Sequence, residues 1–331
     1  MSFDAFLLLS FGGPEGPDDV MPFLRNATRG RGVPESRLAA VAEHYLQFGG
    51  VSPINAQNRA LLAAVEKDFT EHGIALPLYW GNRNWHPFLA DAVRRMRDDG
   101  VRRALVLTTS ATSSYSSCRQ YRENMAAAQA EVEDAPELVK LRHYFDHPGF
   151  IAANADGVRT ALADRPDARL VFTAHSIPVR MDEAAGPAGG LYSRQQRETA
   201  RLVAEAVRGS GAQFDLVWQS RSGAPDAAWL EPDVNDHLRA LAASGVHSVV
   251  VCPTGFVSDH MEVVWDLDTE ARRTAAELGL DFARAATAGT HPTFVAMIRE
   301  LVLEETDGAP RAALGKLGIC GRDCPDGCCL V

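Results

Sequence analysis

One histidine and one row of carboxylates are the residues best suited to catalysis in this chain. His175 ends an apolar run and precedes Ser-Ile-Pro, while Glu262, Asp266 and Glu270 recur at every fourth position. An imidazole titrates near neutral pH and can accept protons, and carboxylate oxygens are ligands for hard divalent cations. Together these residue types favour a reaction that removes protons and handles a divalent cation.

Each feature also has a purely structural interpretation, since a histidine can be a satisfied core residue and a charged row is often a solvated helix face. Pro178 favours a functional role for His175, because proline fixes the turn that follows the strand. The three carboxylates share one face of a helix, and this helix follows a strongly apolar strand. We therefore predict that the imidazole and the carboxylate row face a ligand-binding cleft.

Two further segments are suited to binding a flat or anionic ligand. Arg29 lies in the basic run Arg25-Asn-Ala-Thr-Arg-Gly-Arg31 of a chain whose net charge is −10. Arginine pairs with carboxylates in a fixed fork geometry, although a single surface arginine more often serves solubility. Trp229 lies in a loop, where an indole either anchors the loop or forms the wall of an aromatic ligand site. The pattern alone leaves both interpretations of Trp229 open.

The cysteines are concentrated near the end of the chain. Four of the six lie in Cys320-Gly-Arg-Asp-Cys-Pro-Asp-Gly-Cys-Cys329, whereas Cys118 and Cys252 stand apart. Such crowding favours metal binding over disulfides in a cytosolic protein, and an iron–sulfur cluster needs four thiolates. Because adjacent cysteines would be strained as ligands of one cluster, Cys118 is the candidate for a distant fourth ligand. Cys252, within an apolar strand, is predicted to be an inert buried thiol.

Composition and patterning narrow the class of protein. The chain has 331 residues, 46% of them apolar, and its acidic balance argues against general nucleic-acid binding. We expect no transmembrane segment and no signal peptide, and hence a cytoplasmic location.

Short apolar runs alternate with longer segments of helical period, which is typical of βαβ units and a parallel sheet. The predicted strands are 5–11, 76–80, 104–109, 139–142, 170–175, 216–219, 248–253 and 281–285. The predicted helices include 34–48, 55–72, 87–99, 119–133, 149–163, 193–209, 233–244, 262–278 and 291–305. The two halves follow one plan, which predicts an α/β fold of two Rossmann-like lobes with a cleft between them. We place the lobes at 1–150 and 151–307, and a cysteine-rich tail at 308–331.

Ordered motifs along most of the chain resemble those of the ferrochelatase family, whose members insert Fe²⁺ into a porphyrin in haem biosynthesis. The motifs are Leu8-Leu-Ser-Phe-Gly-Gly-Pro14, Gly49-Gly-Val-Ser-Pro53, Thr173-Ala-His-Ser-Ile-Pro178, Val217-Trp-Gln-Ser220 with Trp229-Leu-Glu-Pro232, and Gly255-Phe-Val-Ser-Asp-His-Met-Glu262. The resemblance implies a two-lobed chelatase fold that holds the macrocycle in the interlobe cleft. It also implies a lyase, with coproporphyrin III favoured over protoporphyrin IX as the substrate.

The resemblance further implies roles for individual residues. His175 and Glu262 would be the catalytic and Fe²⁺-binding pair, with Asp266 and Glu270 as an outer metal path. The expected contacts with the macrocycle or its propionates are Phe11, Arg29, Tyr45, Ser52, Tyr121 and Trp229. Phe11 stands where some relatives have a tyrosine. Phenylalanine lacks the tyrosine hydroxyl, so Phe11 cannot ligate iron.

The resemblance also implies a [2Fe–2S] cluster at the end of the chain. Four of the five thiols Cys118, Cys320, Cys324, Cys328 and Cys329 would ligate it. We expect a monomer that acts alongside another haem-pathway enzyme.

Two alternative functions stay open: one is a related chelatase, and the other is a protein of a different class that has no catalytic activity. A cobalt chelatase acting on an early tetrapyrrole would share the fold, and assays with several metals would distinguish it. A non-catalytic porphyrin-binding iron–sulfur sensor would bind porphyrin tightly but would not metallate it. The presence of both His175 and Glu262 argues against such a sensor.

Overall fold

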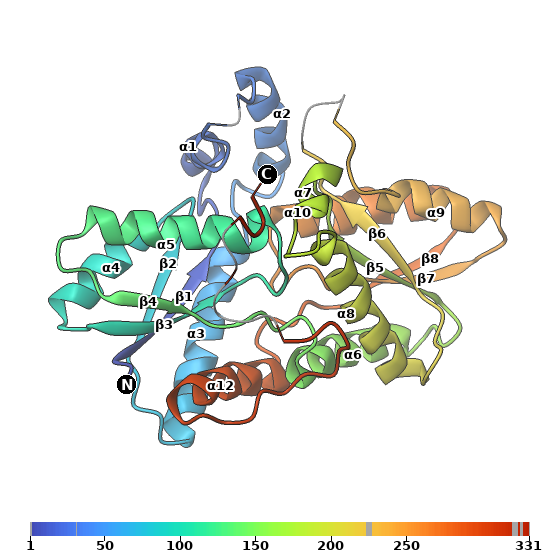
Figure 1. The fold of residues 1–331 in the computed structure, drawn as a ribbon. Coiled ribbons are helices and arrows are strands. Elements are labelled where there is room, and N and C mark those ends of the chain that lie inside the picture. The colour runs from blue at the N-terminus through green and yellow to red at the C-terminus, as the bar shows by residue number, and fades with distance from the viewer. Residues whose placement is uncertain (1, 31, 223–226, 320–323, 325–326, 331) are drawn as a thin grey trace. The chain divides into compact units, whose positions relative to one another are not determined.

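The first of two sheets is built from the first half of the chain. The computed structural model describes residues 2–30, 32–222, 227–319, 324 and 327–330. Strands β1 (Ala5–Ser10), β2 (Leu78–Asn82), β3 (Arg103–Thr108) and β4 (Glu137–Lys140) form a parallel sheet in the order β2-β1-β3-β4. Its helices are α1 (Pro17–Ala27), α2 (Glu35–Leu46), α3 (Ile54–Glu71), α4 (Leu89–Asp98) and α5 (Gln120–Glu131) (Figure 1).

The second sheet repeats this topology. Strands β5 (Arg169–His175), β6 (Asp215–Gln219), β7 (Ser248–Cys252) and β8 (Asp281–Arg284) are parallel and ordered β6-β5-β7-β8. The α-helices of the second half are α6 (Pro148–Leu162), α7 (Val179–Glu183), α8 (Leu191–Arg208), α9 (Val234–Ala243), α10 (Met261–Val263), α11 (Arg272–Glu277) and α12 (Pro292–Thr306). Two π-helical segments, η1 (Tyr115–Arg119) and η2 (Val264–Ala271), complete the described elements. Two parallel sheets with helices confirm the predicted α/β class.

The chain divides into two compact units that are not simple halves. The first unit comprises Met1–Thr109, Tyr121–Leu141 and Ser258–Met261, and the second comprises Ser110–Gln120, Arg142–Val257 and Glu262–Val331. The segment around η1 therefore packs with the second unit, although it lies between β3 and α5 in sequence.

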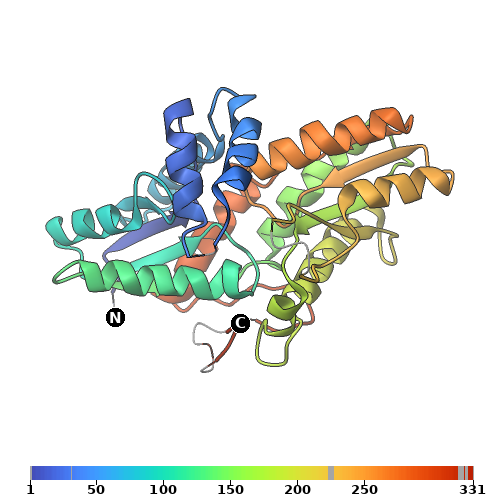
Figure 2. The same ribbon diagram turned by 90° about the horizontal axis from the view of Figure 1, so that it is seen from above.

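Burial explains why the strands of the second sheet are apolar throughout. Phe172 and Ala174 face a core that includes residues of α6 and α8, whereas Val171 and Val251 face a second core shared with α9 and η2. Successive side chains of a strand point to opposite faces, so a sheet covered on both sides needs apolar residues at every position. Figure 2 shows helices of this unit on both sides of its sheet. Cys252 is 1% exposed, which confirms the prediction of a buried thiol, and burial raises its pKa to about 12.

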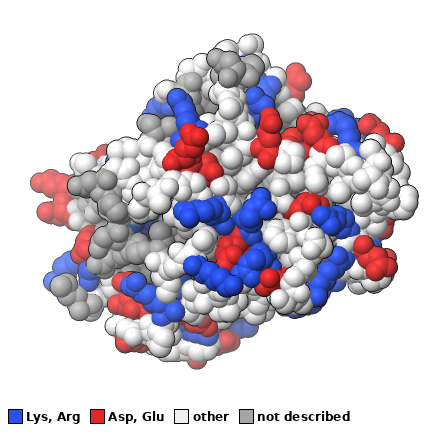
Figure 3. Space-filling model, turned by 45° about the vertical axis from the view of Figure 1, so that its right-hand side comes forward, with Lys and Arg blue, Asp and Glu red and all other residues white. Residues whose placement is uncertain are grey.

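Surface charge is mixed on the part of the molecule seen in Figure 3, where acidic side chains lie among the basic ones. On α8, for example, Arg201 pairs with Glu198 and Glu205 at N–O distances of 2.8 and 2.6 Å. Within the described part of the chain, no helix combines the length and apolar character that a membrane span requires.

Candidate functional site

His175 lies at the carboxyl end of β5, where ligand sites of parallel sheets form. Its backbone carbonyl accepts a hydrogen bond from the Tyr192 hydroxyl at 2.7 Å, and its Nδ1 contacts the Ser176 carbonyl. Its Nε2 lies 3.6 Å from Oε1 of Glu262. The two side chains are 31% and 45% exposed, so a ligand can reach both of them. The structure therefore brings together the histidine and the first carboxylate that the sequence singled out.

The carboxylate row lies on a helix that differs from the prediction. The prediction of a single α-helix over 262–278 is wrong, because α10 passes into the π-helical segment η2 and then into α11. A π-helix has a wider turn, with backbone hydrogen bonds between residues five apart, and such turns are common at functional sites. Glu262 precedes η2, and Asp266 and Glu270 lie within it.

Asp266 is the most strongly perturbed member of the row. Burial raises its pKa to about 7, against the lowering effect of the Ser220 hydrogen bond, and the Glu262 and Glu270 charges raise it further. The Ser220 hydroxyl donates to Oδ2 of Asp266, and Gln219 Nε2 donates to the same oxygen at 3.4 Å. Asp266 can therefore exchange a proton near neutral pH.

The pKa of His175 is also shifted. Burial disfavours its protonated form, but the charge and hydrogen bond of Glu262, the Ser176 carbonyl and the Asp266 charge together outweigh this effect and raise the pKa above its usual value. A raised pKa makes the imidazole a stronger base. The arrangement can accept a proton at Nε2 and stabilise the resulting imidazolium.

The Trp229 loop lies against the turn that follows His175. Leu230 N donates to the Ile177 carbonyl at 3.0 Å, and Ser176 Oγ donates to the Leu230 carbonyl at 2.8 Å. Trp229 itself forms an isolated antiparallel β-bridge with Pro178. Its indole N–H is buried and has no acceptor among the described residues. A buried donor of this kind is costly unless a ligand or water satisfies it.

The other predicted substrate contacts belong to the first unit. Phe11 is 38% exposed and packs edge-on against Phe23, which also contacts the buried Tyr45 at 5.9 Å between ring centroids. Ser52 is buried, and its amide donates to the Pro14 carbonyl at 2.9 Å.

Arg29 and Tyr121 of the same unit occupy different environments. Arg29 is exposed and follows the end of α1. Tyr121 is buried at the start of α5, and the Arg83 guanidinium lies over its ring at 4.4 Å from the centroid.

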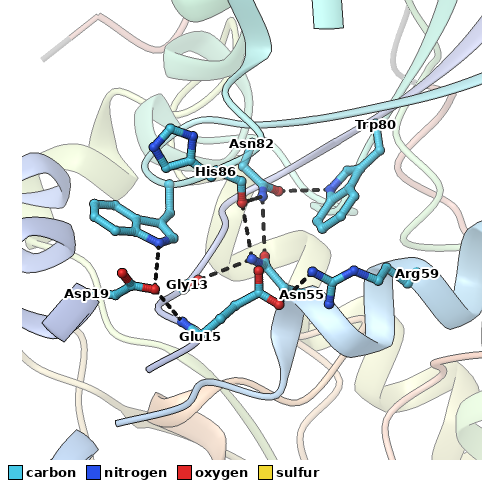
Figure 4. A network of polar contacts seen from close by, with 9 residues as sticks. Gly13, Glu15, Asp19, Asn55, Arg59, Trp80, Asn82 and His86 are labelled. Carbon is cyan, nitrogen blue, oxygen red and sulfur yellow. Dashed lines mark hydrogen bonds and ion pairs between the residues drawn. The ribbon is translucent and has the colours of Figure 1, made fainter. Parts of the chain in front are cut away.

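A buried amide network fixes the strand ends of the first unit (Figure 4). Asn55 Nδ2 donates to the carbonyls of Gly13 and His86 at 3.2 and 3.1 Å, and Asn82 Nδ2 donates to Asn55 Oδ1 at 3.2 Å. A Cβ atom at Gly13 would lie 2.7 Å from the Ser52 Cβ, so only glycine allows this close approach. The network holds the turn after β1 against the loop after β2.

Several thiols surround one cavity of the second unit. The cavity has a volume of ≈ 330 Å³ and is lined by Cys118, Cys324, Cys328 and Cys329, together with Arg194 and Leu317. The sulfurs of Cys328 and Cys329 are 3.7 Å apart. Cys320, the remaining predicted ligand, lies outside the described residues. Among the described residues, no three His, Cys, Asp or Glu side chains are arranged so that they could hold a metal ion.

Buried charges anchor the segment that leads to these cysteines. Arg142 pairs with Glu304 and donates from Nη2 to the Ala312 carbonyl at 2.7 Å. Lys316 N donates to Glu198 Oε1 at 3.0 Å. Residues 312–316 are thereby held against the rest of the second unit.

The sequence did not single out several side chains that contribute to these arrangements. Tyr192 contacts His175, and Ser220 contacts Asp266. Arg83 lies over the ring of Tyr121 and donates to Asn124, which lies within α5. Ser220 directly follows an apolar strand, and Arg83 directly follows the end of another. That position was the available signal for both, although a polar residue after a strand is common in any α/β protein.

A family model described as ferrochelatase matches residues 3–306. The chain belongs to the ferrochelatase family. The predicted family and enzyme class, a lyase of haem biosynthesis, are therefore confirmed. Among curated relatives, the coproporphyrin III ferrochelatase of Nocardia farcinica is 59% identical over 99% of this chain and 97% of its own length. The coproporphyrin III ferrochelatase of Streptomyces griseus subsp. griseus is 56% identical over 99% of this chain and 93% of its own length.

Solved chelatase structures share the fold of this family member. The sirohydrochlorin chelatase SirB from Bacillus subtilis subspecies spizizenii, in complex with cobalt, matches with a TM-score of 0.54 at 11% identity. The match covers 93% of this chain and 97% of that chain. SirB from Bacillus subtilis with Fe³⁺ gives a TM-score of 0.52 at 12% identity, covering 93% and 98%. At such low identity, these likenesses establish only a chelatase-type fold.

Proposed function

We propose that this chain inserts Fe²⁺ into coproporphyrin III, with His175 and Glu262 at the site of insertion. The observation that carries the proposal is the 3.6 Å approach of His175 Nε2 to Glu262 Oε1, with both side chains accessible. The coproporphyrin III ferrochelatases at 56% and 59% identity support this substrate over protoporphyrin IX.

Metal insertion exchanges the two pyrrole N–H protons for Fe²⁺, so charge balances without any electron transfer. In our proposal, His175 Nε2 accepts these protons, because a neutral imidazole beside a carboxylate is a base suited to neutral pH. Glu262 stabilises the imidazolium that forms. Asp266, with its pKa of about 7, passes protons on towards water.

The carboxylate row also suits the second half of the reaction. Fe²⁺ must lose bound water before the pyrrole nitrogens can coordinate it, and carboxylate oxygens can replace that water. We assign Glu262 to the inner position and Asp266 and Glu270 to the outer path. Burial is the main cause of the raised pKa of Asp266, and the Glu262 and Glu270 charges add to it; an approaching cation would relieve that repulsion.

The macrocycle contacts remain those proposed from the sequence: Phe11, Arg29, Tyr45, Ser52, Tyr121 and Trp229. The buried indole N–H of Trp229 supports its place among them, since it lacks an acceptor in the described part of the chain. Monomeric state, a haem-pathway enzyme partner and cytoplasmic location stay predictions.

We also propose a [2Fe–2S] cluster bound by Cys118 and tail cysteines. The fit rests on the cavity that Cys118, Cys324, Cys328 and Cys329 line, because four thiols gathered from distant segments are the donor set that such a cluster requires. When bound, the cluster would crosslink the tail to the segment around η1 or report on oxidants. The anchors at Arg142 and Glu198 bring the tail to this cavity.

Spectroscopy tests the cluster without reference to activity. Wild-type protein should show reddish-brown visible absorption and equal amounts of iron and acid-labile sulfide. Cys118→Ser should lose both, whereas Cys252→Ser, at a buried thiol outside the cavity, should keep them. A colourless wild-type protein purified anaerobically would exclude the cluster.

Anaerobic assays of metal insertion test the main proposal. Purified protein is incubated with Fe²⁺ and either coproporphyrin III or protoporphyrin IX, and initial rates are compared. We expect faster insertion into coproporphyrin III. Parallel reactions with Co²⁺ and Zn²⁺ test the cobalt-chelatase alternative, and tight porphyrin binding without insertion of any metal would favour the sensor.

A further inference from the structure

Two adjacent cysteines face the same thiol-lined cavity of the second unit. The sulfurs of Cys328 and Cys329 lie 3.7 Å apart, and both side chains line this cavity. Neighbouring side chains of an extended chain point to opposite sides. Cys329 instead has a φ of 57°, in the left-handed region, and this turn of the backbone leaves both thiols on one side. The folded backbone therefore sets the pair, as well as the sequence.

The two thiols differ in their access to solvent. Cys329 is 3% exposed, whereas Cys328 is partly exposed. The cavity that they line has a volume of ≈ 330 Å³, far more than the ~15 Å³ that a cavity needs to hold one water molecule. A small oxidant can therefore reach Cys328, while Cys329 is shielded.

Hydrogen bonds from two other segments hold the pair in place. Gly186 N donates to Cys329 Sγ at 3.3 Å. Arg119 Nη1 donates to the Cys328 carbonyl at 3.2 Å. One bond fixes a sulfur and the other fixes the backbone, so the two thiols are kept close together.

The loop that carries Gly186 is itself fixed. The Asp182 carbonyl accepts hydrogen bonds from Ala185 N and Gly190 N, both at 2.8 Å. Its side chain is also engaged, since Ser193 N donates to Asp182 Oδ1 at 3.0 Å. The Gly186 amide is therefore presented to the sulfur from a closed, hydrogen-bonded loop.

The proposed [2Fe–2S] cluster does not use every thiol of the chain. It needs four thiolates, and Cys118 and the four tail cysteines supply five candidates. Because adjacent cysteines would be strained as ligands of one cluster, a member of the pair is the spare thiol. A spare thiol beside a second thiol is suited to chemistry between the two sulfurs.

We propose that Cys328 and Cys329 form a reversible disulfide when hydrogen peroxide oxidises the protein. Peroxide converts the Cys328 thiol to a sulfenic acid and releases one water. The Cys329 thiol then attacks this sulfur, so that an S–S bond forms, the S–O bond breaks and a second water leaves. Two thiols are oxidised and one peroxide is reduced, and no other reactant is needed.

Two properties make this disulfide a switch. Consecutive Cα atoms lie about 3.8 Å apart across a trans peptide, closer than the ~4.4–6.8 Å usual between bridged cysteines, so the bond is strained and readily reduced. Oxidation also removes two of the five candidate ligands, which leaves fewer than the four that the cluster needs. The inference does not require iron insertion, and only its effect on the cluster rests on the proposed cluster.

Mass spectrometry of the full-length protein is the direct test. Trypsin cleaves after Arg322 and releases residues 323–331, which contain Cys324 as well as the pair. In Cys324→Ser protein, only the pair can form a bond within this peptide. After peroxide treatment, unfolding and labelling with iodoacetamide, we expect the peptide to lack the mass of two hydrogen atoms and to carry no label. Reduced glutathione should restore both thiols.

Single substitutions separate the roles of the two thiols. Cys329→Ser should stop the reaction at the Cys328 sulfenic acid, which dimedone captures. Cys328→Ser should lose the reaction at this pair, because the remaining thiol is shielded. Cys252 does not line the cavity and is the control in every sample, where it should stay fully reactive with iodoacetamide. Thermal melts check that each variant is folded, and fragmentation of the wild-type peptide locates the bond without any substitution.

Three results would overturn the inference: free thiols at Cys328 and Cys329 after peroxide, a sulfinic or sulfonic acid at Cys328 without a bond, or a bond from the pair to Cys118 or Cys324. Resistance of the bond to glutathione would contradict its reversibility. The test of the cluster stays separate. A colourless protein that still forms the bond would refute the cluster and leave the pair standing, and a coloured protein whose pair stays reduced would refute only the pair.

Discussion

The two sheets share one strand order, yet different kinds of side chain occupy their carboxyl ends. Neutral amides lie at this end of the first sheet, where Asn82 ends β2 and Asn55 of α3 is hydrogen-bonded to it, both fully buried. The second ends at His175, beside Glu262 and Asp266, which can gain or lose a proton. The same topology therefore supplies a fixed framework in one unit and a titratable centre in the other.

The difference follows from what each end must do. A buried amide keeps the same charge at every pH, so a network of amides holds its geometry under all conditions. A carboxylate such as Asp266 exchanges protons only because it is partly desolvated among like charges, which destabilises its ionised form. Fold alone does not specify chemistry, and the residues that follow each strand decide it.

Removing the imidazole should have the largest effect. His175→Ala is expected to lower kcat by about 10²–10⁴-fold, the usual contribution of a positioned general base. The porphyrin Kd should change little. His72→Ala is the matched control, because His72 is an exposed histidine that caps the C-terminus of α3, and it should leave kcat unchanged. Near-normal iron insertion by His175→Ala at saturating substrate would remove the chemical contrast between the two units.

Removing an amide from the framework should cost stability rather than chemistry. Asn55→Ala removes three hydrogen bonds of the buried network and leaves the Gly13 carbonyl without its donor, although Asn82 Nδ2 still donates to the His86 carbonyl, so unfolding should become easier by about 2–3 kcal/mol. Denaturant unfolding measures this, with the exposed Gln213→Ala as control at about 0.5 kcal/mol or less. A kcat loss as large as that of His175→Ala would contradict the division of roles.

Replacing Asp266 with a neutral residue should reveal how much its ionised carboxylate destabilises the folded protein. Its folded pKa of about 7 lies above the ordinary 3.8, so its contribution to stability is present at low pH and is lost as pH rises through about 7. In iron-free protein, Asp266→Asn should therefore raise the Tm at pH 8 and change it little at pH 4. Its iron-insertion rate should fall about tenfold. An unchanged Tm difference across this pH range would show that the carboxylate is not strained.

The smallest effect is expected at Tyr192, which supports the backbone of His175. Tyr192→Phe keeps the contact with Trp218 and removes the hydrogen bonds of the hydroxyl, which are the 2.7 Å bond to the His175 carbonyl and one with Gln196. The stability loss should be about 1–2 kcal/mol, as for one or two buried hydrogen bonds. The kcat should drop by about twofold to fivefold without a change in the metal preference. Denaturant unfolding and initial rates check both values, and a loss comparable with that of His175→Ala would make Tyr192 part of the chemistry.

Local pattern was sufficient for the main elements of both sheets. Runs such as that of β5, buried on both faces, admit only apolar residues, so the strands are visible in the sequence. Helix α1 was not predicted, because Pro17 and Pro22 obscure its pattern, although a proline at the first helical position is well tolerated. The π-helical turn of η2 was also missed, since i, i+4 spacing suggests an ordinary helix.

The sequence by itself determined the α/β class, the family motifs and the residue types that can move protons and hold a cation. Those properties depend on neighbours along the chain, which the sequence displays directly. Only the tertiary structure decided that His175 lies within 3.6 Å of Glu262, that Asp266 titrates near neutral pH, and that Arg83 lies against Tyr121. Burial and the distances between charges set these properties, and both arise from segments that meet only when the chain folds.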